Sequence, residues 1–465
     1  MIRLPRAKPT TWIFALGVLL VHLASALPLQ GPLHADELYQ YLETPFRALH
    51  GYGFRVWEFD RGTRNWLLPG CILGILRACE AMRVSDPLQQ LLAVRLAEKL
   101  LFLWGLWNLV RACDLLAGRR AAWLCALSVG LLPLLVLATS HPLSEPFSMS
   151  LVMLATLPAA RFTRQPLLRH LALCGALLGL ATVVRLQTGV LIPAFAAFAL
   201  AQPGPRLRAL ALLGGAGVTL ALGGLLDLWT YGEFAHSAIA NLNAHFENGA
   251  ALQTQMGTQP ATFYATEALR HLGPLALLLL AAALWTFWRQ GADLFALPAL
   301  VLLGVHAAVP HKELRFLLPA LPLLLAALCL AVDEFWRRRW LPVGAALLWL
   351  ASAQPSWRAL GTAPSTGTIQ AARFLSAKAE LRDWCTVGTG CFGGAGYFFL
   401  RRDVPFHEFA SFPHIVAARA KDPGVCDYVT TTTIGVLPPP PGAYVRVAHF
   451  DGADVFATPE AAKAP

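Results

Sequence analysis

The sequence predicts an all-α, multi-pass integral membrane protein with about eleven transmembrane helices (range about 10–13) and a small C-terminal α/β domain. Three observations lead to this fold class. Apolar residues make up 56% of the chain, charged residues only 14%, and the mean hydropathy is +0.53. Long apolar runs alternate with short arginine-containing loops, and after residue 354 the composition becomes mixed and polar. A soluble enzyme with one large core is therefore excluded.

The predicted spans are apolar runs close to the roughly 20 residues that a helix needs to cross a bilayer. Some are shorter, which indicates tilted or broken helices near Arg185 and Pro193. The first run could instead be a cleaved signal peptide, but we favour a retained span because many spans follow it. The runs are 11–29, 88–110, 121–139, 143–160, 170–184, 188–201, 208–228, 271–288, 293–309, 316–332 and 340–354.

The arginine clusters orient these spans. With a cytoplasmic N-terminus, every cluster between spans falls on the cytoplasmic side, as the positive-inside tendency requires. This arrangement also explains the formal charge of +10 without nucleic acid as a partner. The odd number of spans places the tail outside, so we expect a transmembrane domain over 1–354 and an outer domain over 355–465. The clusters are Arg111/Arg119/Arg120, Arg161/Arg164/Arg169, Arg206/Arg208, Arg289 and Arg337/Arg338/Arg339.

The first outer loop, residues 30–87, is predicted to contain interfacial helices. Over 36–50, Leu38, Leu42, Phe46 and Leu49 share one helical face, with the charged residues on other faces. Residues 66–82 could form another span, but the run is short, carries two charges and would reverse the later arginine clusters. We interpret it as an amphipathic helix at the membrane surface.

In the tail, the pattern predicts a helix over 366–381 and strands within 404–409, 426–433 and 443–450. A G-x-G-x-x-G match at 388–393 is interpreted as a tight turn, because a lone match is common and an outer domain has no access to dinucleotides. We expect no cofactor and no metal. Cys385, Cys391 and Cys426 would allow one disulfide outside the cytoplasm, with its partners left open.

Polar groups from separate loops gather at the predicted outer face. Ionisable groups at membrane depth are unfavourable unless they pair or line a polar cavity, so this gathering predicts a functional pocket. A second long loop on this side covers 229–270. The groups are His34, Asp36, Glu37, Glu145, Arg185, Gln187, His311, Lys312, Glu313 and Arg315.

Two of these stretches carry most of the argument. In "HADE", the acids Asp36 and Glu37 could simply cap a surface helix. In "HKELRF", three basic groups lie outside, against the positive-inside tendency, and an anionic ligand would resolve that conflict. Arg95, Glu98 and Lys99 within a span are interpreted as an internal ion-pair group.

The chain resembles the polyprenyl(dolichyl)-phosphate-mannose-dependent α-mannosyltransferases, glycosyltransferase family 22, which extend N-glycan precursors and GPI anchors. The likeness rests on "HADELYQYLE" with "GYGFRVWEFDRGTRNWLLPG", on "SHPLSEP", on "DLWTYGEFAHSAIANLNAHFENGAA" with "MGTQPATFY", and on "HKELRFLLPALPLL". It covers most of residues 30–325 in order. Ala35 stands where the family often has proline, and Asn65 where serine is usual.

The resemblance implies a GT-C fold and an inverting transfer of mannose, or another sugar, from a polyprenyl-phosphate donor to a glycan or glycolipid acceptor. Asp36 is the expected base, with Glu37 beside it. A departing phosphate needs charge stabilisation, which we assign to His311, Lys312, Arg315 and Arg185. Acceptor or supporting roles fall to His34, Gln40, Trp57, Glu58, Arg64, Glu145, Gln187 and Glu313, although Trp57 and Glu58 serve interfacial packing equally well.

Two other classes of function stay open at this point. A transporter or flippase of lipid-linked sugars would also have about a dozen spans, but its coupling charges should lie at mid-membrane between internal repeats. A non-catalytic lipid-binding protein is the other. The alanine-, leucine- and arginine-rich composition suggests a bacterial inner membrane, with the site and the C-terminal domain periplasmic and membrane lipids as partners.

Overall fold

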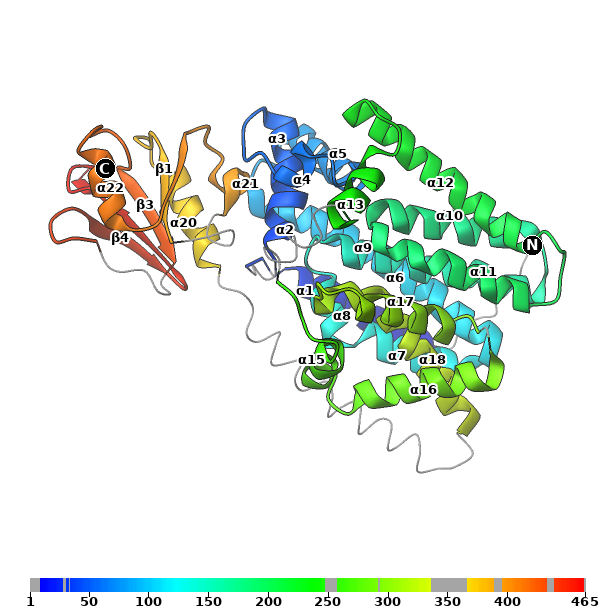
Figure 1. Ribbon diagram of the computed structural model, residues 1–465. Helices are drawn as coiled ribbons and strands as arrows, with labels where there is room; N and C mark the ends of the chain where they lie inside the picture. Colours follow the sequence, from blue (N-terminus) through cyan, green and yellow to red (C-terminus); the bar gives the residue numbers. More distant parts are fainter. Residues whose placement is uncertain are drawn as a thin grey trace. The chain divides into compact units, whose positions relative to one another are not determined.

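The computed structural model describes residues 9–27, 31–32, 34–246, 257–291, 293–335, 366–388, 395–432 and 439–463. The chain forms two compact units (Figure 1). The helical unit comprises 1–27, 61–68 and 95–361, and the loop–sheet unit comprises 28–60, 69–94 and 362–465. The contacts therefore do not divide the chain at residue 354, because most of the first outer loop packs with the tail.

The helical unit consists of long apolar helices joined by short connections. Its core is made of alanine, leucine and phenylalanine side chains from most of these helices. The elements are α1 (Pro9–Ala26), α6 (Pro87–Ala117, which starts in the other unit), α7 (Arg119–Gly130), α8 (Pro133–Ala138), α9 (Ser144–Arg164), α10 (Leu168–Val184), η2 (Leu186–Val190), α11 (Leu191–Ala201), α12 (Arg208–Tyr231), α13 (His236–Phe246), α15 (Phe263–Leu272), α16 (Leu275–Gln290), α17 (Ala296–Ala308), η3 (Leu314–Ala320) and α18 (Leu321–Phe335).

The predicted spans coincide with helices in the described residues, except 340–354, which lies outside them. By length and composition, three of the described helices can cross a membrane: Pro87–Ala117, Arg208–Tyr231 and Leu314–Glu334. The pair Phe263–Leu272 and Leu275–Arg289 would be a fourth, bent by 118°. The apolar helices Leu16–Ala26, Leu168–Val184, Leu186–Ala201 and Ala296–Ala308 are shorter than a full span, whereas α9 has 21 residues but carries charged residues at both ends.

Backbone breaks explain why several apolar runs are not single helices. The run 121–139 breaks before Pro133, whose ring cannot continue a helix, and α7 ends at Gly130. The run 271–288 starts across a bend at Gly273 and Pro274. Arg185 has extended backbone angles between α10 and η2. Hydropathy reads these runs as continuous because it contains no information about backbone angles.

Helices α10 and α12 lie side by side along most of their lengths (Figure 1). Glycines permit this approach: a Cβ added at Gly175 would lie 1.8 Å from the Leu212 carbonyl oxygen, and one at Gly215 would lie 1.9 Å from that of Ala172. Small residues at helix interfaces are a common way for membrane helices to reach close van der Waals contact.

The loop–sheet unit combines short helices with one mixed sheet. The helical elements are α2 (Ala35–Leu38), η1 (Tyr39–Glu43), α3 (Thr44–His50), α4 (Trp57–Asp60), α5 (Leu67–Ala81), α20 (Gly367–Ser376), α21 (Gly396–Leu400), α22 (Phe412–Arg419) and η5 (Ala461–Lys463). The strands are β1 (Trp384–Val387), β2 (Phe406–Phe409), β3 (Tyr428–Thr432), β4 (Val445–Phe450) and β5 (Ala453–Ala457), in the order β2-β1-β3-β5-β4. Strands β1, β2 and β3 are parallel, and β5 is antiparallel to β3 and β4. The sequence pattern missed β5.

The helix over 36–50 differs from its prediction. The segment contains a π-helical turn, η1, and buries Glu37, Gln40 and Glu43 together with Leu38 and its apolar neighbours. The placement of the charged residues away from the buried face was therefore wrong. A π-turn inserts one extra residue and changes which side chains share a face, and Phe398 of the tail packs against Phe46 of this segment.

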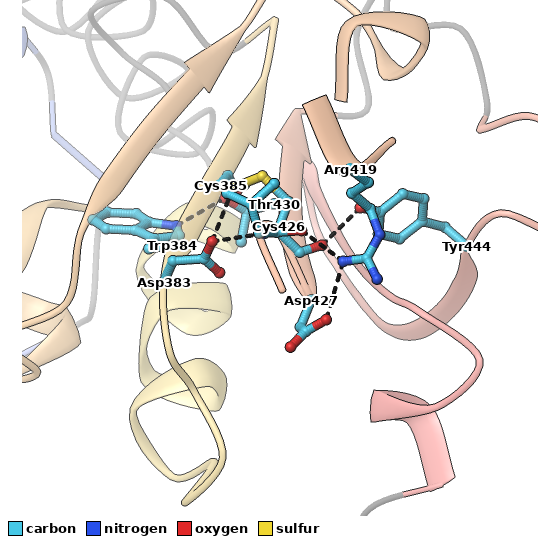
Figure 2. The surroundings of a disulfide bond; sticks show 9 residues. Asp383, Trp384, Cys385, Arg419, Cys426, Asp427, Thr430 and Tyr444 are labelled. Carbon is cyan, nitrogen blue, oxygen red and sulfur yellow. Dashed lines mark hydrogen bonds and ion pairs between the residues drawn. A yellow bond between two sulfur atoms is a disulfide. The ribbon is translucent and has the colours of Figure 1, made fainter. Parts of the chain in front are cut away.

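Cys385 and Cys426 form the disulfide of the tail, joining the start of β1 to the segment before β3 (Figure 2). The Asp383 carboxylate accepts a hydrogen bond of 2.6 Å from the Cys426 amide, and Arg419 bonds to the Val425 carbonyl and to Asp427. Cys391 and most of the glycine-rich segment 388–393 lie outside the described residues.

The close α10–α12 contact predicts opposite effects for two glycine-to-alanine changes. Gly175→Ala should lower the melting temperature, because its methyl group meets a backbone carbonyl of α12. Gly217→Ala, a control on α12 where nothing lies within 4 Å, should be neutral or stabilise by up to about 1 kcal/mol through helix propensity. Thermal melts in detergent measure both. Equal melting temperatures for the two variants would refute the close contact.

Candidate functional site

A buried carboxylate bridges two arginines in the helical unit. Glu145, in the first turn of α9, is 0% exposed. Its Oε1 lies 3.1 Å from Arg185 Nη1 and 3.2 Å from Arg315 Nε. Ser144 joins this group, since its hydroxyl accepts from Arg185 and donates to Glu145 Oε2. We call Glu145, Arg185 and Arg315 the arginine bridge.

The loop before η3 adds further charges to the arginine bridge. Glu313 Oε2 accepts from Arg315 Nε at 2.5 Å, and Glu313 Oε1 lies 3.0 Å from His311 Nε2. The Glu313 carboxylate raises the pKa of His311, so the imidazolium persists to higher pH than in an isolated histidine. His311 Nδ1 also bonds to the Gly257 carbonyl, at 3.2 Å.

Lys312 is held by backbone groups. Its Nζ donates to the Val309 carbonyl at 2.6 Å and to the Gln259 carbonyl at 3.2 Å, and the residue is 5% exposed. These bonds fasten the 309–313 loop to the segment before α15. The phosphate-binding role assigned to Lys312 stays a prediction, and the geometry favours a structural role.

Phe316 orders the two guanidinium groups. Arg185 Cζ lies 4.7 Å and Arg315 Cζ 5.7 Å from the ring centroid. Such cation–π contacts are worth about 0.5–2 kcal/mol each, more when desolvated. The ring holds two cations close together that would otherwise repel one another.

The charges of this cluster leave a positive surplus. Arg185 and Arg315 balance Glu145 and Glu313, so the surplus comes from Lys312, whose ammonium bonds to backbone carbonyls, and from His311 when it is protonated. Arg315, with its side chain 16% exposed, is the more accessible of the two arginines, since Arg185 is 4% exposed. A partly buried cationic cluster of this kind suits a singly charged phosphodiester.

In the loop–sheet unit, His34 and Asp36 open helix α2. His34 Nδ1 accepts the Asp36 backbone N–H at 3.2 Å and thereby caps the helix. The Asp36 side chain is 19% exposed, whereas Glu37 is 2% exposed. Of the two predicted catalytic acids, Asp36 is therefore the more exposed one.

Gln40 and Glu58 form a hydrogen-bonded pair in the same unit. Gln40 Nε2 donates to Glu58 Oε1 at 2.8 Å, and both residues are buried. The bond links η1 to α4. Trp57, the neighbour of Glu58, is 44% exposed, a placement that leaves both its interfacial and its substrate-binding interpretations open.

The remaining predicted residues lie in the helical unit. The Arg64 carbonyl accepts from the Tyr231 hydroxyl at 2.7 Å, within a 61–68 segment that is also held by Asn65, whose amide donates to buried Asp227 at 2.7 Å. Gln187 lies in η2, two residues after Arg185, and its Oε1 is buried without a hydrogen-bond partner among the described residues.

The structure thus brings the predicted residues together in two groups. Glu145, Arg185, His311, Glu313 and Arg315 form one, in the helical unit. His34, Asp36, Glu37, Gln40 and Glu58 form the other, in the loop–sheet unit. Their joint action on one substrate stays a prediction.

Among the described residues, Asp383, Cys385 and Cys426 are the group with metal-ligand geometry. The two sulfurs are joined in the disulfide and offer no thiolate, so this group does not suit a metal.

Sequence reasoning missed Glu43, Phe316 and Asp227. Glu43 and Asp227 are buried carboxylates with several hydrogen bonds, and Phe316 is the ring under the two arginines. The available signal was a lone acid in an apolar environment, as at Asp227 within a predicted span.

Comparison with known proteins gives a consistent result. The model of the Alg9-like mannosyltransferase family matches residues 12–383. The chain is 26% identical to GPI mannosyltransferase 3 of Yarrowia lipolytica over 338 residues, which is 70% of this chain and 64% of that protein. It is 29% identical to mannosyltransferase APTG1 of Arabidopsis thaliana over 100 residues, covering 22% and 18%. The matches therefore span less than two thirds of the length of these relatives.

Solved structures share the fold. ArnT from Cupriavidus metallidurans bound to undecaprenyl phosphate superimposes with a TM-score of 0.64 at 14% identity, covering 98% of this chain and 100% of that one. The Archaeoglobus fulgidus oligosaccharyltransferase gives 0.56 at 13% identity, covering 89% and 68%. Both belong to the GT-C fold, so the predicted fold class is confirmed.

The arginine bridge predicts a large stability loss for Glu145→Gln. Removing the buried negative charge leaves two arginines without their shared partner, which should cost about 3–5 kcal/mol. Glu233→Gln is the matched control, because Glu233 is paired with His236 in the same unit but its side chain is 74% exposed. Its effect should stay within about 1 kcal/mol. Chemical or thermal unfolding in detergent measures both, and equal stabilities would contradict the bridge.

Proposed function

Because the chain belongs to the Alg9-like mannosyltransferase family, we propose that it is an inverting glycosyltransferase of the membrane. It transfers mannose, or another sugar, from a polyprenyl-phosphate donor to a hydroxyl of a lipid-linked or cell-envelope glycan. The arginine bridge carries this proposal, because its two guanidinium groups, with His311 and Lys312 on the adjacent loop, suit a lipid-linked phosphate. The undecaprenyl phosphate named for the ArnT structure supports a donor of this class.

Asp36 serves as the base in this mechanism. The acceptor oxygen forms a bond to the anomeric carbon while the bond from that carbon to the phosphate oxygen breaks, and the hydroxyl proton passes to the Asp36 carboxylate. Inversion requires the base and the leaving phosphate on opposite faces of the sugar. Asp36 suits this role because it is more exposed than Glu37. Glu37 supports it through the electrostatics of an adjacent carboxylate.

Arg315 and Arg185 stabilise the departing polyprenyl phosphate. The leaving phosphate gains negative charge as the bond breaks, and pre-positioned guanidinium groups stabilise that charge without reorganisation. His311 contributes a further positive charge, which declines as pH rises through its raised pKa. Donor affinity should therefore weaken toward alkaline pH.

The proposed location is a bacterial inner membrane, with the N-terminus cytoplasmic and the site periplasmic. The arginine-rich loops support this orientation through the positive-inside tendency. Transport of lipid-linked sugars, the alternative class, is unsupported, because the matched family and the relatives named above are transferases.

Asp36→Asn should reduce transfer by about two to four orders of magnitude, because an amide cannot accept the acceptor proton and general base catalysis contributes about 10²–10⁴-fold. Transfer of radiolabelled mannose from a polyprenyl-phosphate donor into lipid extract, monitored alongside thermal melting, measures the change. Asp60→Asn is the control, since Asp60 is an exposed acid of the same unit. Near-normal turnover by folded Asp36→Asn would remove Asp36 from the base role.

Arg315→Ala should raise the KM for donor by about 10- to 100-fold, the loss expected for a hydrogen bond to a charged group. Lys312→Ala should lower the melting temperature more than it changes donor KM, since Lys312 Nζ bonds backbone carbonyls. Arg270→Ala, with its side chain 75% exposed in the same unit, is the control. Unchanged donor KM in Arg315→Ala would count against phosphate binding by this residue.

A further inference from the structure

Glu43 is a buried carboxylate seven residues after Asp36, and the proposed reaction does not use it. It ends the π-turn η1 and is 0% exposed. Its two oxygens bond to different segments: Oε1 accepts the Phe398 backbone N–H at 2.5 Å, and Oε2 accepts the Phe54 backbone N–H at 3.2 Å. One side chain thus connects the first outer loop, upstream and downstream of α3, to α21 of the tail.

Two glycines make room for this carboxylate. Gly396 has a φ of +70°, and a Cβ there would lie 2.2 Å from Glu43 Oε1. Gly53 has a φ of +128°, and a Cβ there would lie 3.3 Å from Oε2. Both positions combine a left-handed backbone with close approach, which suits glycine alone. Together with the Phe54 and Phe398 amides, they form a seat that is shaped for one carboxylate, which we call the Glu43 seat.

Arg401 provides a positive charge that acts on Glu43. Its guanidinium lies 5.0 Å from the Phe46 ring centroid and 5.1 Å from that of Phe398, and it donates to Gln90 Oε1. Its Nη1 lies 4.0 Å from Glu80 Oε1. Arg401 therefore ties α21 to α5 and α6 while its charge favours an ionised Glu43.

The Glu43 seat restrains the helical segment that carries Asp36. Residues 35–50 form one continuous helical segment, α2, η1 and α3, with Asp36 in its first turn and Glu43 at the end of its π-turn. Because a helix is stiff over this length, fixing Glu43 fixes the rotation at which Asp36 projects. The bond from Gln40 to Glu58 restrains the same segment on another face.

We infer that Glu43 is a positioning residue for Asp36, and that residues 395–401 of the tail complete the proposed catalytic apparatus. This inference rests on the proposed function. The groups that receive Glu43 from the tail lie beyond residue 383, where the match to the family model ends. The tail is then part of the enzyme's working structure, and the family-matched region is insufficient for activity.

The seat also gives the reaction a pH dependence. Burial raises the pKa of Glu43 to about 7, against the effect of the two amides and Arg401. The other titratable groups whose charges interact with it are Tyr52 and Tyr397, both neutral in this pH range, and His50 and Glu80 lie beyond Arg401. Below the pKa, the protonated carboxyl accepts two N–H bonds less well, so kcat falls as pH drops through about 7.

Glu43→Gln tests this role in the full-length protein. The amide keeps the size of the side chain but offers one acceptor oxygen to two N–H donors. We expect kcat to fall about 10- to 100-fold with donor KM changed less than about 2-fold, since the donor cations lie in the other unit. The inflection of kcat near pH 7 should disappear. Glu408→Gln is the matched control: Glu408 is an exposed acid on β2 of the same unit, and its variant should leave kcat and its pH profile unchanged.

The possible outcomes separate this inference from the proposed function. If the wild-type protein transfers no sugar, the proposed function fails and this inference with it. If the wild type is active and folded Glu43→Gln keeps its kcat and its pH profile, only the positioning role is overturned. If Glu43→Gln does not fold, Gly396→Ala tests the positioning role instead. Its methyl group should displace the Glu43 carboxylate, so we expect the same loss of kcat at unchanged donor KM. Should that variant also fail to fold, a wild-type kcat without an inflection between about pH 6 and 8 overturns the inference.

Discussion

The pairing of buried charge is the constraint on which this structure depends. Glu145 lies fully buried between Arg185 and Arg315, and none of the three charges would be tolerated there alone. The carboxylate allows two guanidinium groups to lie within one protein interior, and Phe316 keeps them at the same site. Arg315 stays partly accessible after this pairing, and His311 and Lys312 on the adjacent loop add positive charge, which suits the proposed lipid-linked phosphate.

The loop–sheet unit also contains a buried charge, and it stabilises that charge in a different way. The Phe398 and Phe54 backbone amides donate to the Glu43 carboxylate, and the charge of Arg401 favours its ionised form. A carboxylate held by amides is more directional than one held by a flexible ion pair, because each amide is fixed by its own backbone. This difference suits the two proposed tasks: attracting an anionic donor in one unit, and orienting a base in the other.

Helix packing sets where these groups lie in the helical unit. The α10–α12 contact is close because Gly175 and Gly215 remove side chains from the interface, and α10 ends where Arg185 adopts an extended backbone. The end of a tightly packed helix is a rigid place from which to present a charged side chain. The helix breaks at Arg185 and before η3 therefore also set the positions of the charged side chains in the proposed site.

The sequence by itself determined the apolar helices, the membrane class and most members of the two polar groups, since these depend on local hydropathy and on short motifs such as "HADE" and "HKELRF". Most strands of the tail followed from local pattern too, although β5 did not. Only the tertiary structure decided which carboxylates are buried, which cysteines pair and where helices break. Glu43 shows the reason. An ideal helix would place its side chain away from the apolar face, but the amides that donate to it belong to residues 54 and 398, one of them more than three hundred residues away. No local pattern encodes a partner at that distance, because such a contact is chosen by the folding of the whole unit.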